Sequence, residues 1–299
     1  MKIIGVDIGG TSIKGIVINE MGDCLEETRM STEAKRGKEH IALHVEKVIG
    51  QLLSRYPDAA GIGIGTAGRV DVKTGQIVYA TNNLPGWQGF ELGEWCEGKF
   101  GLPVVVDNDA NTALAGEAWL GAGVGLSDLT MLTLGTGVGG ANMIGGKLYR
   151  GAHWNGGEWG HVVLVPNGYP CNCGMQGCIE QYVSGTALVR LAREAAGRDY
   201  TTGHEVFADF KRGQPEVLAV VQRFISDLAL VIHNIHIGLN PQAIIIGGGV
   251  AESKSIWFDL LKGKLAELSP VIEVRAATLG NRAGAIGAAR LVLESLKES

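Results

Sequence analysis

The sequence predicts an α/β fold in two domains. Strand-like runs alternate with helical patterns along the whole chain, as they do in mixed α/β proteins. The chain has 299 residues, and a domain typically holds roughly 150. An arrangement of strand, glycine turn and strand opens the chain. It recurs after the glycine-rich segment Gly121–Gly125, where we expect the domain boundary.

The first half is expected to begin with an antiparallel meander. Two turns, Gly9-Gly10 and Met21–Asp23, separate three strand-like runs at Lys2–Ile8, Ile13–Asn19 and Cys24–Met30. The hydrophobic pattern after them predicts, in order, a helix at Lys38–Arg55, a strand at Gly61–Gly65, a hairpin of Val70–Val72 and Gln76–Tyr79, a helix at Glu91–Phe100, a strand at Pro103–Val106 and a helix at Ala110–Leu120.

The second half is expected to repeat the opening hairpin. A glycine turn at Gly135–Gly140 joins a strand at Leu129–Leu134 to a strand at Ala141–Gly145. The pattern after it predicts helices at Ser184–Ala196, His204–Lys211 and Glu216–Leu239, a strand at Ala243–Ile246, a helix at Ser255–Leu268, a strand at Val271–Val274 and a helix at Ala283–Leu296.

Composition argues against several classes of function. Acidic residues outnumber basic ones by 31 to 26, whereas a nucleic-acid-binding protein needs a basic face. The most apolar stretch, Val217–Leu239, contains Arg223 and Asp227, so it predicts a packed helix and not a membrane span. The N-terminus shows no signal-peptide pattern, and we therefore expect a cytoplasmic protein with no membrane or nucleic-acid partner.

Glycine is the unusual residue type of this chain. Its 46 residues are about twice the usual share of ~7%, which indicates tight turns and close backbone approach to ligands. Two segments, Gly63–Gly68 and Gly135–Gly140, fit the G-x-G-x-x-G pattern of dinucleotide sites. That pattern requires a helix directly after the turn, and both segments lead into strand patterns. A Rossmann site is therefore not expected.

Glycine turns that follow strands can bind phosphate through backbone N–H groups. The segment Asp7–Thr11 is one such turn, in which Thr11 adds a hydroxyl and Asp7 suits the shell of a Mg²⁺ ion. The segment Gly135–Gly140, with Thr136 as donor, is another, and Gly247–Gly249 is a third. One such turn alone is explained equally well as an ordinary hairpin. Turns at the head of both halves favour a nucleoside triphosphate.

The segment Asp107–Asn111 is a candidate catalytic segment. It follows an apolar strand and precedes a helix, and a carboxylate at the carboxyl end of a strand suits a general base. Capping of the helix N-terminus is the alternative explanation, since Asp and Asn are favoured there. Four polar residues in this segment exceed what a cap requires.

Four residues predict a structural zinc site. His161, Cys171, Cys173 and Cys178 supply one imidazole and three thiolates, which is the donor set of a closed zinc site. A disulfide framework is not expected, because the chain has an odd number of cysteines and is long and cytosolic in character. The carboxylates of Glu158 and Glu180 flank this loop and suggest a pocket that binds hydroxyl groups.

These motifs together resemble the ROK family of sugar kinases and repressors over nearly the whole chain. The matching segments are Asp7–Thr11, Asn108–Asn111, Leu134–Gly140, Glu158–His161 and Cys171–Glu180. The resemblance implies an actin-like (ribonuclease-H-like) two-domain fold with ATP and sugar in the cleft. It also implies that residues 1–120, completed by the last helix at about 283–299, form the N-terminal domain, and that residues 121–282 form the C-terminal domain with the zinc loop.

The resemblance assigns a role to each residue of the matching motifs. Asp109 is the expected general base toward the sugar 6-hydroxyl. The residues expected to bind the sugar are Gly68, Asn83, Asn108, Glu158, His161 and Glu180. Those expected to bind ATP and Mg²⁺ are Asp7, Gly9, Gly10, Thr11, Thr136, Gly137, Gly139, Gly248 and Gly249. One departure is Asp107, where the family usually has Glu.

The leading hypothesis is an ATP-dependent hexokinase or glucokinase. Kinases of N-acetylmannosamine, N-acetylglucosamine or β-glucosides remain alternatives, because no residue marks or excludes an N-acetyl pocket. A sugar-responsive repressor is disfavoured, because family repressors carry an added N-terminal helix-turn-helix domain and the first motif here begins at Asp7. The expected partners are the sugar, ATP and further copies of the chain in a homodimer or homotetramer.

Overall fold

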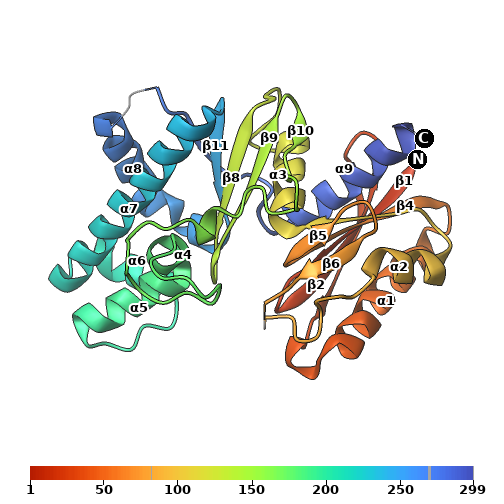
Figure 1. Ribbon diagram of the computed structural model, residues 1–299, viewed down its shortest axis with the longest axis horizontal. Coiled ribbons are helices and arrows are strands. Elements are labelled where there is room, and N and C mark those ends of the chain that lie inside the picture. The colour runs from red at the N-terminus through yellow and green to blue at the C-terminus, as the bar shows by residue number, and fades with distance from the viewer. Residues whose placement is uncertain (82, 269–270, 299) are drawn as a thin grey trace. The chain divides into compact units, whose positions relative to one another are not determined.

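The computed structural model describes residues 1–81, 83–268 and 271–298. The chain forms two compact units, and each contains a mixed five-stranded sheet (Figure 1). Unit 1 consists of Met1–Gly125, Arg150–Gly156 and Thr278–Ser299. Unit 2 consists of Leu126–Tyr149 and Gly157–Ala277. Both units combine strands with helices, so the predicted α/β class is confirmed.

The sheet of unit 1 begins with the predicted meander. Its strands are β1 (Lys2–Ile8), β2 (Ser12–Asn19), β3 (Cys24–Ser31), β4 (Ala59–Thr66) and β7 (Val104–Asn108). Their order in the sheet is β3-β2-β1-β4-β7. The first three pair antiparallel, and β4 and β7 run parallel to β1. A hairpin of β5 (Arg69–Asp71) and β6 (Gln76–Tyr79) follows β4.

Helices cover both faces of this sheet, because successive strand residues point to opposite faces. The helices of unit 1 are α1 (Lys38–Arg55), α2 (Leu92–Phe100), α3 (Asp109–Leu120) and α9 (Ala283–Glu298). Ile4 belongs to the core that α1 covers, and its neighbour Ile3 to the core that α9 covers. Helix α9 lies so close to β4 that a Cβ on Gly63 would stand 1.8 Å from the carbonyl oxygen of Ala288. Only glycine fits this position.

The sheet of unit 2 has the same pattern of strand directions. Its strands are β8 (Leu129–Leu134), β9 (Val138–Ile144), β10 (Lys147–Leu148), β11 (Ala243–Gly247) and β12 (Val274–Ala276). Their order is β10-β9-β8-β11-β12. Strand β9 pairs antiparallel with β8 and β10, whereas β8, β11 and β12 run parallel.

The core of unit 2 is built from large side chains. Its helices are α4 (Glu180–Val183), α5 (Gly185–Ala196), α6 (Gly203–Lys211), α7 (Pro215–Leu239) and α8 (Lys254–Leu268). Phe207, Phe224 and Trp257 are buried together, with ring centroids 6.3–6.4 Å apart. Helix α7 contains the most apolar stretch of the sequence. No helix among the described residues is long and apolar enough to cross a membrane.

Two strands begin three residues away from their predicted starts. The last strand lies at Val274–Ala276, not at Val271–Val274, because parallel pairing places Val274 opposite Ile244 and leaves Val271 74% exposed. Strand β9 begins at Val138, not at Ala141, so Gly139 lies in the hairpin ladder opposite Thr133. In both cases the partner strand sets the boundary.

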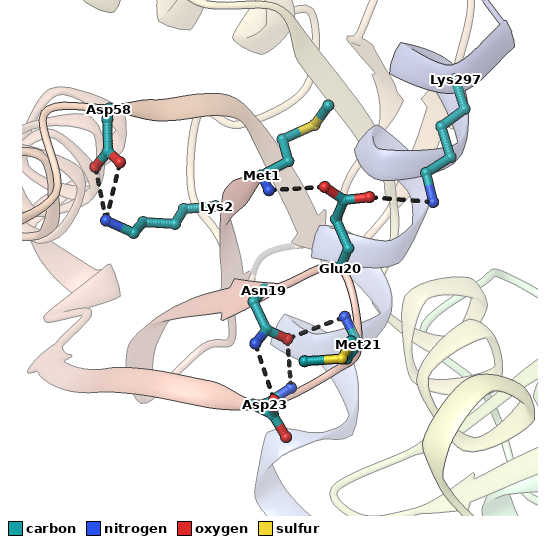
Figure 2. A network of polar contacts seen from close by, with 8 residues as sticks. All are labelled: Met1, Lys2, Asn19, Glu20, Met21, Asp23, Asp58 and Lys297. Carbon is teal, nitrogen blue, oxygen red and sulfur yellow. Dashed lines mark hydrogen bonds and ion pairs between the residues drawn. The ribbon is translucent and has the colours of Figure 1, made fainter.

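Polar contacts join the first strands to the last helix at one edge of unit 1 (Figure 2). The Glu20 carboxylate accepts a hydrogen bond from the Met1 ammonium at 2.7 Å and pairs with Lys297 of α9 at 3.7 Å. Beside it, the Asn19 Oδ1 atom accepts the Asp23 N–H at 2.9 Å and shapes the turn between β2 and β3. The ammonium groups also lower the pKa of Glu20 through hydrogen bonding and charge.

Candidate functional site

The first glycine turn lies between β1 and β2 and is held in shape from inside the unit. The buried Thr32 donates its hydroxyl to the Gly9 carbonyl at 2.6 Å, and its N–H to the Thr11 carbonyl at 3.1 Å. Gly10 and Thr11 are exposed. The turn therefore presents its outer backbone to solvent with a fixed conformation. No sequence pattern marked Thr32, because its role depends on the pairing of β2 with β3.

Asp7 lies at the end of β1 beside this turn. Antiparallel pairing places Lys14 opposite it, and the Lys14 Nζ atom donates to Asp7 Oδ2 at 3.2 Å. Burial raises the pKa of Asp7, and the Lys14 charge opposes that rise. Gly284 of α9 faces the carboxylate, since a Cβ there would stand 2.9 Å from Asp7 Cγ. Asp7 is therefore a partly buried carboxylate with one cation beside it, and carboxylate oxygens are ligands that Mg²⁺ accepts.

In the segment after β7, one residue caps helix α3 and the next carries the candidate catalytic carboxylate. Asn108 is the N-cap of α3, and its Oδ1 atom accepts the N–H groups of Ala110 at 2.8 Å and Asn111 at 3.2 Å. Asp109 is the first residue of the helix, is partly exposed, and accepts the Ala110 N–H at 2.9 Å. Asn108 thus accepts two of the free N–H groups of the helix, and Asp109 shares one of them, so the helix keeps its N-cap without the Asp109 carboxylate.

Asn108 also links this segment to the loop after β4. Its Nδ2 group donates to the Gly68 carbonyl at 2.9 Å. Gly68 has a φ of 104°, and a Cβ there would stand 2.4 Å from the Tyr79 carbonyl oxygen, so the position requires glycine. Asn83 is exposed in the loop after β6, and its carbonyl oxygen lies 3.8 Å from where a Cβ on Gly10 would stand. Unit 1 thus places Gly68 next to Asn108, and Asn83 next to the first glycine turn.

The second glycine turn joins β8 to β9 in unit 2. The Gly135 N–H donates to the Gly137 carbonyl at 3.0 Å, and the Gly135 carbonyl accepts the Gly185 N–H of α5 at 2.8 Å. Thr136, at the tip, is exposed. A Cβ on Gly137 would stand 2.5 Å from the Glu180 carboxylate. The structure therefore brings Glu180 directly beside this turn.

The third glycine turn lies at the same edge of the sheet of unit 2. Strands β8 and β11 are parallel, so their carboxyl ends meet there. Gly248 has a φ of 82°, and a Cβ on it would stand 2.5 Å from the Leu134 carbonyl oxygen. Gly248 and Gly249 are both exposed. Two glycine turns thus lie side by side within unit 2.

A short 3₁₀ helix, Trp159–His161, positions the residues around it. Trp159 Nε1 donates to Asn142 Oδ1 at 3.0 Å, which anchors the helix on β9. Gly160 lies against the same strand, since a Cβ there would stand 2.0 Å from the Val138 carbonyl oxygen. Glu158, which precedes the helix, and His161, which ends it, remain partly exposed. The two middle residues of this segment therefore serve packing, while the outer two carry polar groups at the surface of unit 2.

His161 and the three cysteines converge in one cluster. Their ligand atoms all lie within 4.8 Å of one another. The Cys171 Sγ and His161 Nδ1 atoms are 3.6 Å apart, as are the Cys173 and Cys178 sulfurs. Bonds of ~2.3 Å to a tetrahedral zinc would place two sulfurs roughly 3.8 Å apart. The donor set and its spacing fit a structural Zn²⁺ ion.

The cluster of His161 and the three cysteines also contacts Glu180, a residue expected to bind the sugar. Cys171 Sγ lies 3.1 Å from the Glu180 Oε1 atom, and Glu180 is the first residue of α4. The Val163–Cys178 bridge and the bond from Ile179 N–H to the Val162 carbonyl hold the two sides of the loop together. Burial raises the pKa of the Cys178 thiol in the metal-free protein, so zinc binding would release its proton.

One functional neighbour was missed by sequence reasoning. Arg150 forms an ion pair with Asp107 at 2.6 Å, and Asp107 is only 1% exposed. Arg150 lies far along the chain, in the Arg150–Gly156 segment that belongs to unit 1. The sequence held one signal for this pair: Asp107 follows an apolar strand, and a carboxylate that becomes buried there needs a cation beside it.

Comparison with known proteins gives matches over the whole chain. The ROK family matches residues 3–295. A protein named glucokinase from Halalkalibacterium halodurans is 36% identical, over 97% of this chain and 94% of that protein. The ROK hexokinase structure from Thermus thermophilus has a TM-score of 0.88 and 32% identity, and covers 100% of both chains. A ROK family glucokinase from Streptomyces griseus, in complex with glucose and AMPPNP, has a TM-score of 0.85 and 35% identity, over 97% of this chain and 99% of that chain.

These matches agree with the motifs on which the resemblance was based. The similarity extends from the first strand into the last helix and is not confined to one glycine turn. The predicted actin-like ATPase fold is confirmed by the structural likeness over full-length chains. The chain therefore belongs to the ROK family.

Proposed function

We propose that this protein is an ATP-dependent sugar kinase that transfers a phosphoryl group to the 6-hydroxyl of glucose or a related hexose. Relatives of this length and identity that are named glucokinase and hexokinase support the reaction class. The observation that carries the chemistry is the position of Asp109. Its carboxylate is partly exposed at the carboxyl end of β7, while Asn108 supplies the cap of the helix.

In this reaction Asp109 acts as the general base. The sugar 6-oxygen attacks the γ-phosphorus of ATP, the bond from that phosphorus to the bridging oxygen of ADP breaks, and the hydroxyl proton passes to the Asp109 carboxylate. Phosphoryl transfer depends mostly on positioning and charge stabilisation, so the base need not be strong. A weakly basic carboxylate can accept a proton that is released late in the reaction.

The glycine turns would hold the nucleotide. Gly9, Gly10 and Thr11 in unit 1, with Thr136, Gly137, Gly139, Gly248 and Gly249 in unit 2, are the proposed contacts; Gly139 lies in the ladder of β9 directly after its turn. Exposed turns with fixed backbones suit phosphate oxygens, because their N–H groups need no reorganisation on binding. Asp7 would hold the shell of a Mg²⁺ ion, which supplies positive charge to the transferring phosphoryl group.

Six residues are proposed to bind the sugar. Gly68, Asn83 and Asn108 in unit 1, with Glu158, His161 and Glu180 in unit 2, are the proposed contacts for sugar hydroxyls. Asn108 uses its side chain in the cap and toward Gly68, so we assign it a part in positioning as well. A bound zinc would fix the tautomer of His161 through Nδ1 and direct Nε2 toward the sugar.

A coupled assay of ADP release tests this proposal. The panel contains glucose, mannose, fructose, N-acetylmannosamine, N-acetylglucosamine and cellobiose, each with Mg-ATP. We expect turnover with glucose. Turnover with an N-acetyl sugar or a β-glucoside but not with glucose would select the corresponding alternative, and ADP release that no sugar increases would refute the kinase proposal.

We further propose that the enzyme works in the cytoplasm as a homodimer or homotetramer. Cytoplasmic reducing conditions keep thiols available as metal ligands, and all five cysteines are free thiols. The family resemblance supports an oligomer. Light scattering coupled to size exclusion would measure the mass, and a monomer at the concentration of the assay would refute the second part.

A further inference from the structure

We propose that Arg150 and Asp107 are positioning residues that hold the catalytic segment in its working conformation. The inference rests on the proposed role of Asp109 as general base, and extends it to two residues that do not contact the sugar hydroxyl in that scheme. Its basis is the hydrogen-bond network behind Asn108 and Asp109.

Asp107 is the centre of this network. Its Oδ1 atom accepts the Asn111 Nδ2 group at 2.8 Å and the Asn108 N–H at 2.7 Å. Its Oδ2 atom accepts the Arg150 Nε–H group at 2.8 Å, and the Arg150 Nη2 atom lies 2.6 Å from the same oxygen in the ion pair. One carboxylate therefore fixes the residues on both sides of Asp109, and its charge is balanced by one guanidinium.

The Asn111 amide shows how strongly the segment depends on Asp107. Its Oδ1 atom is buried and has no hydrogen-bond partner within the described part of the chain. The bond from Nδ2 to Asp107 is then the contact that orients the amide. Loss of the Asp107 charge would weaken this bond and would free the first turn of α3 to change conformation.

Arg150 itself is held by a closed loop. The Gly156 N–H donates to the Arg150 carbonyl at 2.8 Å, so the two ends of the Arg150–Gly156 segment are joined. Gly151 and Trp154 adopt positive φ values of 71° and 59° within it. A tight loop of this kind restricts the backbone of Arg150. The segment also leads directly into Gly157 and Glu158 in sequence.

A buried ion pair is weak evidence for stability by itself, because desolvation offsets much of the attraction. The position of the pair behind Asn108 and Asp109 indicates that its role is to orient this segment. Two of the three guanidinium nitrogens, Nε and Nη2, lie against one carboxylate oxygen, and the other oxygen accepts hydrogen bonds from Asn108 and Asn111. A lysine would supply the charge without the planar pair of donors.

A double-mutant cycle tests this proposal in the full-length, zinc-loaded protein. We expect Arg150→Gln and Asp107→Asn each to lower kcat by on the order of 10- to 100-fold, since small displacements at a reacting group have effects of this size. The sugar KM should change much less. Because both residues act through one network, the double variant should lose no more than the worse single variant. Arg150→Lys should retain an intermediate kcat.

The matched control is Arg55→Gln, which removes an arginine–carboxylate pair with Glu26 on the surface of the same unit. Hydrogen exchange supplies a readout that does not depend on kinase activity. Amides of residues 108–111 should exchange faster in Arg150→Gln and Asp107→Asn, and at the normal rate in the control. If the wild-type protein phosphorylates no sugar, the proposed function fails while hydrogen exchange still decides the positioning role.

Three results would overturn the inference. Unchanged exchange at residues 108–111 would show that the pair does not hold the segment. Fully multiplicative losses of kcat in the double variant would show that the two residues act separately. A raised KM with normal kcat in Arg150→Gln would make Arg150 a substrate contact.

Discussion

The two units have the same sheet topology and carry different chemistry. In each, an antiparallel pair encloses a glycine turn, and two further parallel strands follow on one side. In unit 1 the outermost parallel strand, β7, ends in Asp107 and Asn108, and Asp109 begins α3 directly after it. Its counterpart in unit 2, β12, ends at Ala276 and is followed by Ala277 and Thr278. The same sheet thus carries the proposed catalytic segment in one unit and no carboxylate at the matching strand end in the other.

The units also differ in how their helices reach the sheet. Unit 1 uses glycines, such as Gly63 against Ala288, so that backbones lie in contact. Unit 2 uses aromatic side chains, such as Phe224 and Trp257. Unit 2 in addition carries the zinc cluster in the loop after β10. Topology therefore fixes where a ligand can bind, and local sequence fixes what each edge contributes.

The largest expected effect is on catalysis in unit 1. Asp109→Asn keeps the size of the side chain but removes its ability to take a proton. We expect kcat to fall by about 10²–10⁴-fold, or roughly 3–5 kcal/mol, while calorimetric sugar affinity and the melting curve stay near normal. Glu273→Gln, beside β12, is the matched control and should retain full activity. Near-normal turnover of Asp109→Asn would remove it from the role of base.

The next largest effect is on the stability of the two cores, which are packed through aromatic side chains in unit 2 and through glycines in unit 1. Trp257→Ala should destabilise unit 2 by about 3–5 kcal/mol, because a large cavity remains. Gly63→Ala should destabilise unit 1 by about 1–3 kcal/mol, because its Cβ forces α9 away from β4. Urea denaturation of both variants measures these free energies of unfolding. A silent Gly63→Ala would contradict the close contact of α9 with the sheet.

A smaller effect is expected at the zinc cluster. Cys171→Ser should lose the metal and disorder the loop that carries Glu180, so sugar affinity should fall by on the order of 10- to 100-fold. Elemental analysis and calorimetry measure the two effects. Cys96→Ser, at a buried cysteine in unit 1, is the control and should keep its zinc. Zinc-free protein with full sugar affinity would show that the cluster has no part in the sugar site.

The smallest effect is expected at the edge shown in Figure 2. The pKa of Glu20 is lowered in the folded protein, so its contribution to stability is present above the ordinary glutamate pKa of ~4.3 and is lost as the pH falls through the folded value. Glu20→Gln should slightly lower the melting temperature at neutral pH and leave it unchanged in acid. If Glu20→Gln lowered the melting temperature equally at both pH values, the effect would come from packing and not from the charge of Glu20.

The sequence predicted those parts of the site whose residues lie close together in the chain. The glycine turns, the segment Asn108–Asn111 and the cluster of His161 with three cysteines are local patterns, and each occurs where its motif placed it. Whether these residues play their assigned roles stays a prediction. The α/β class followed from the alternation of strand-like and helical patterns, and the family followed from the motifs.

The remaining features depend on contacts between distant segments. Thr32 reaches Gly9 because of the pairing of β2 with β3, and Arg150 reaches Asp107 from a segment 43 positions away in sequence. The start of β12 at Val274 depends on its pairing with β11. The periodicity of hydrophobic residues and the spacing of glycines do not show which distant residues will contact one another.

The central claim is that a hexose 6-hydroxyl receives the phosphoryl group of ATP. Its most direct test compares glucose with 6-deoxyglucose, which has the same ring but no oxygen at that position, and identifies products by phosphorus NMR. We predict stoichiometric formation of ADP and glucose 6-phosphate from glucose, and only background ADP from 6-deoxyglucose. Equal ADP release with both sugars, or a phosphoester at another hydroxyl, would contradict the account.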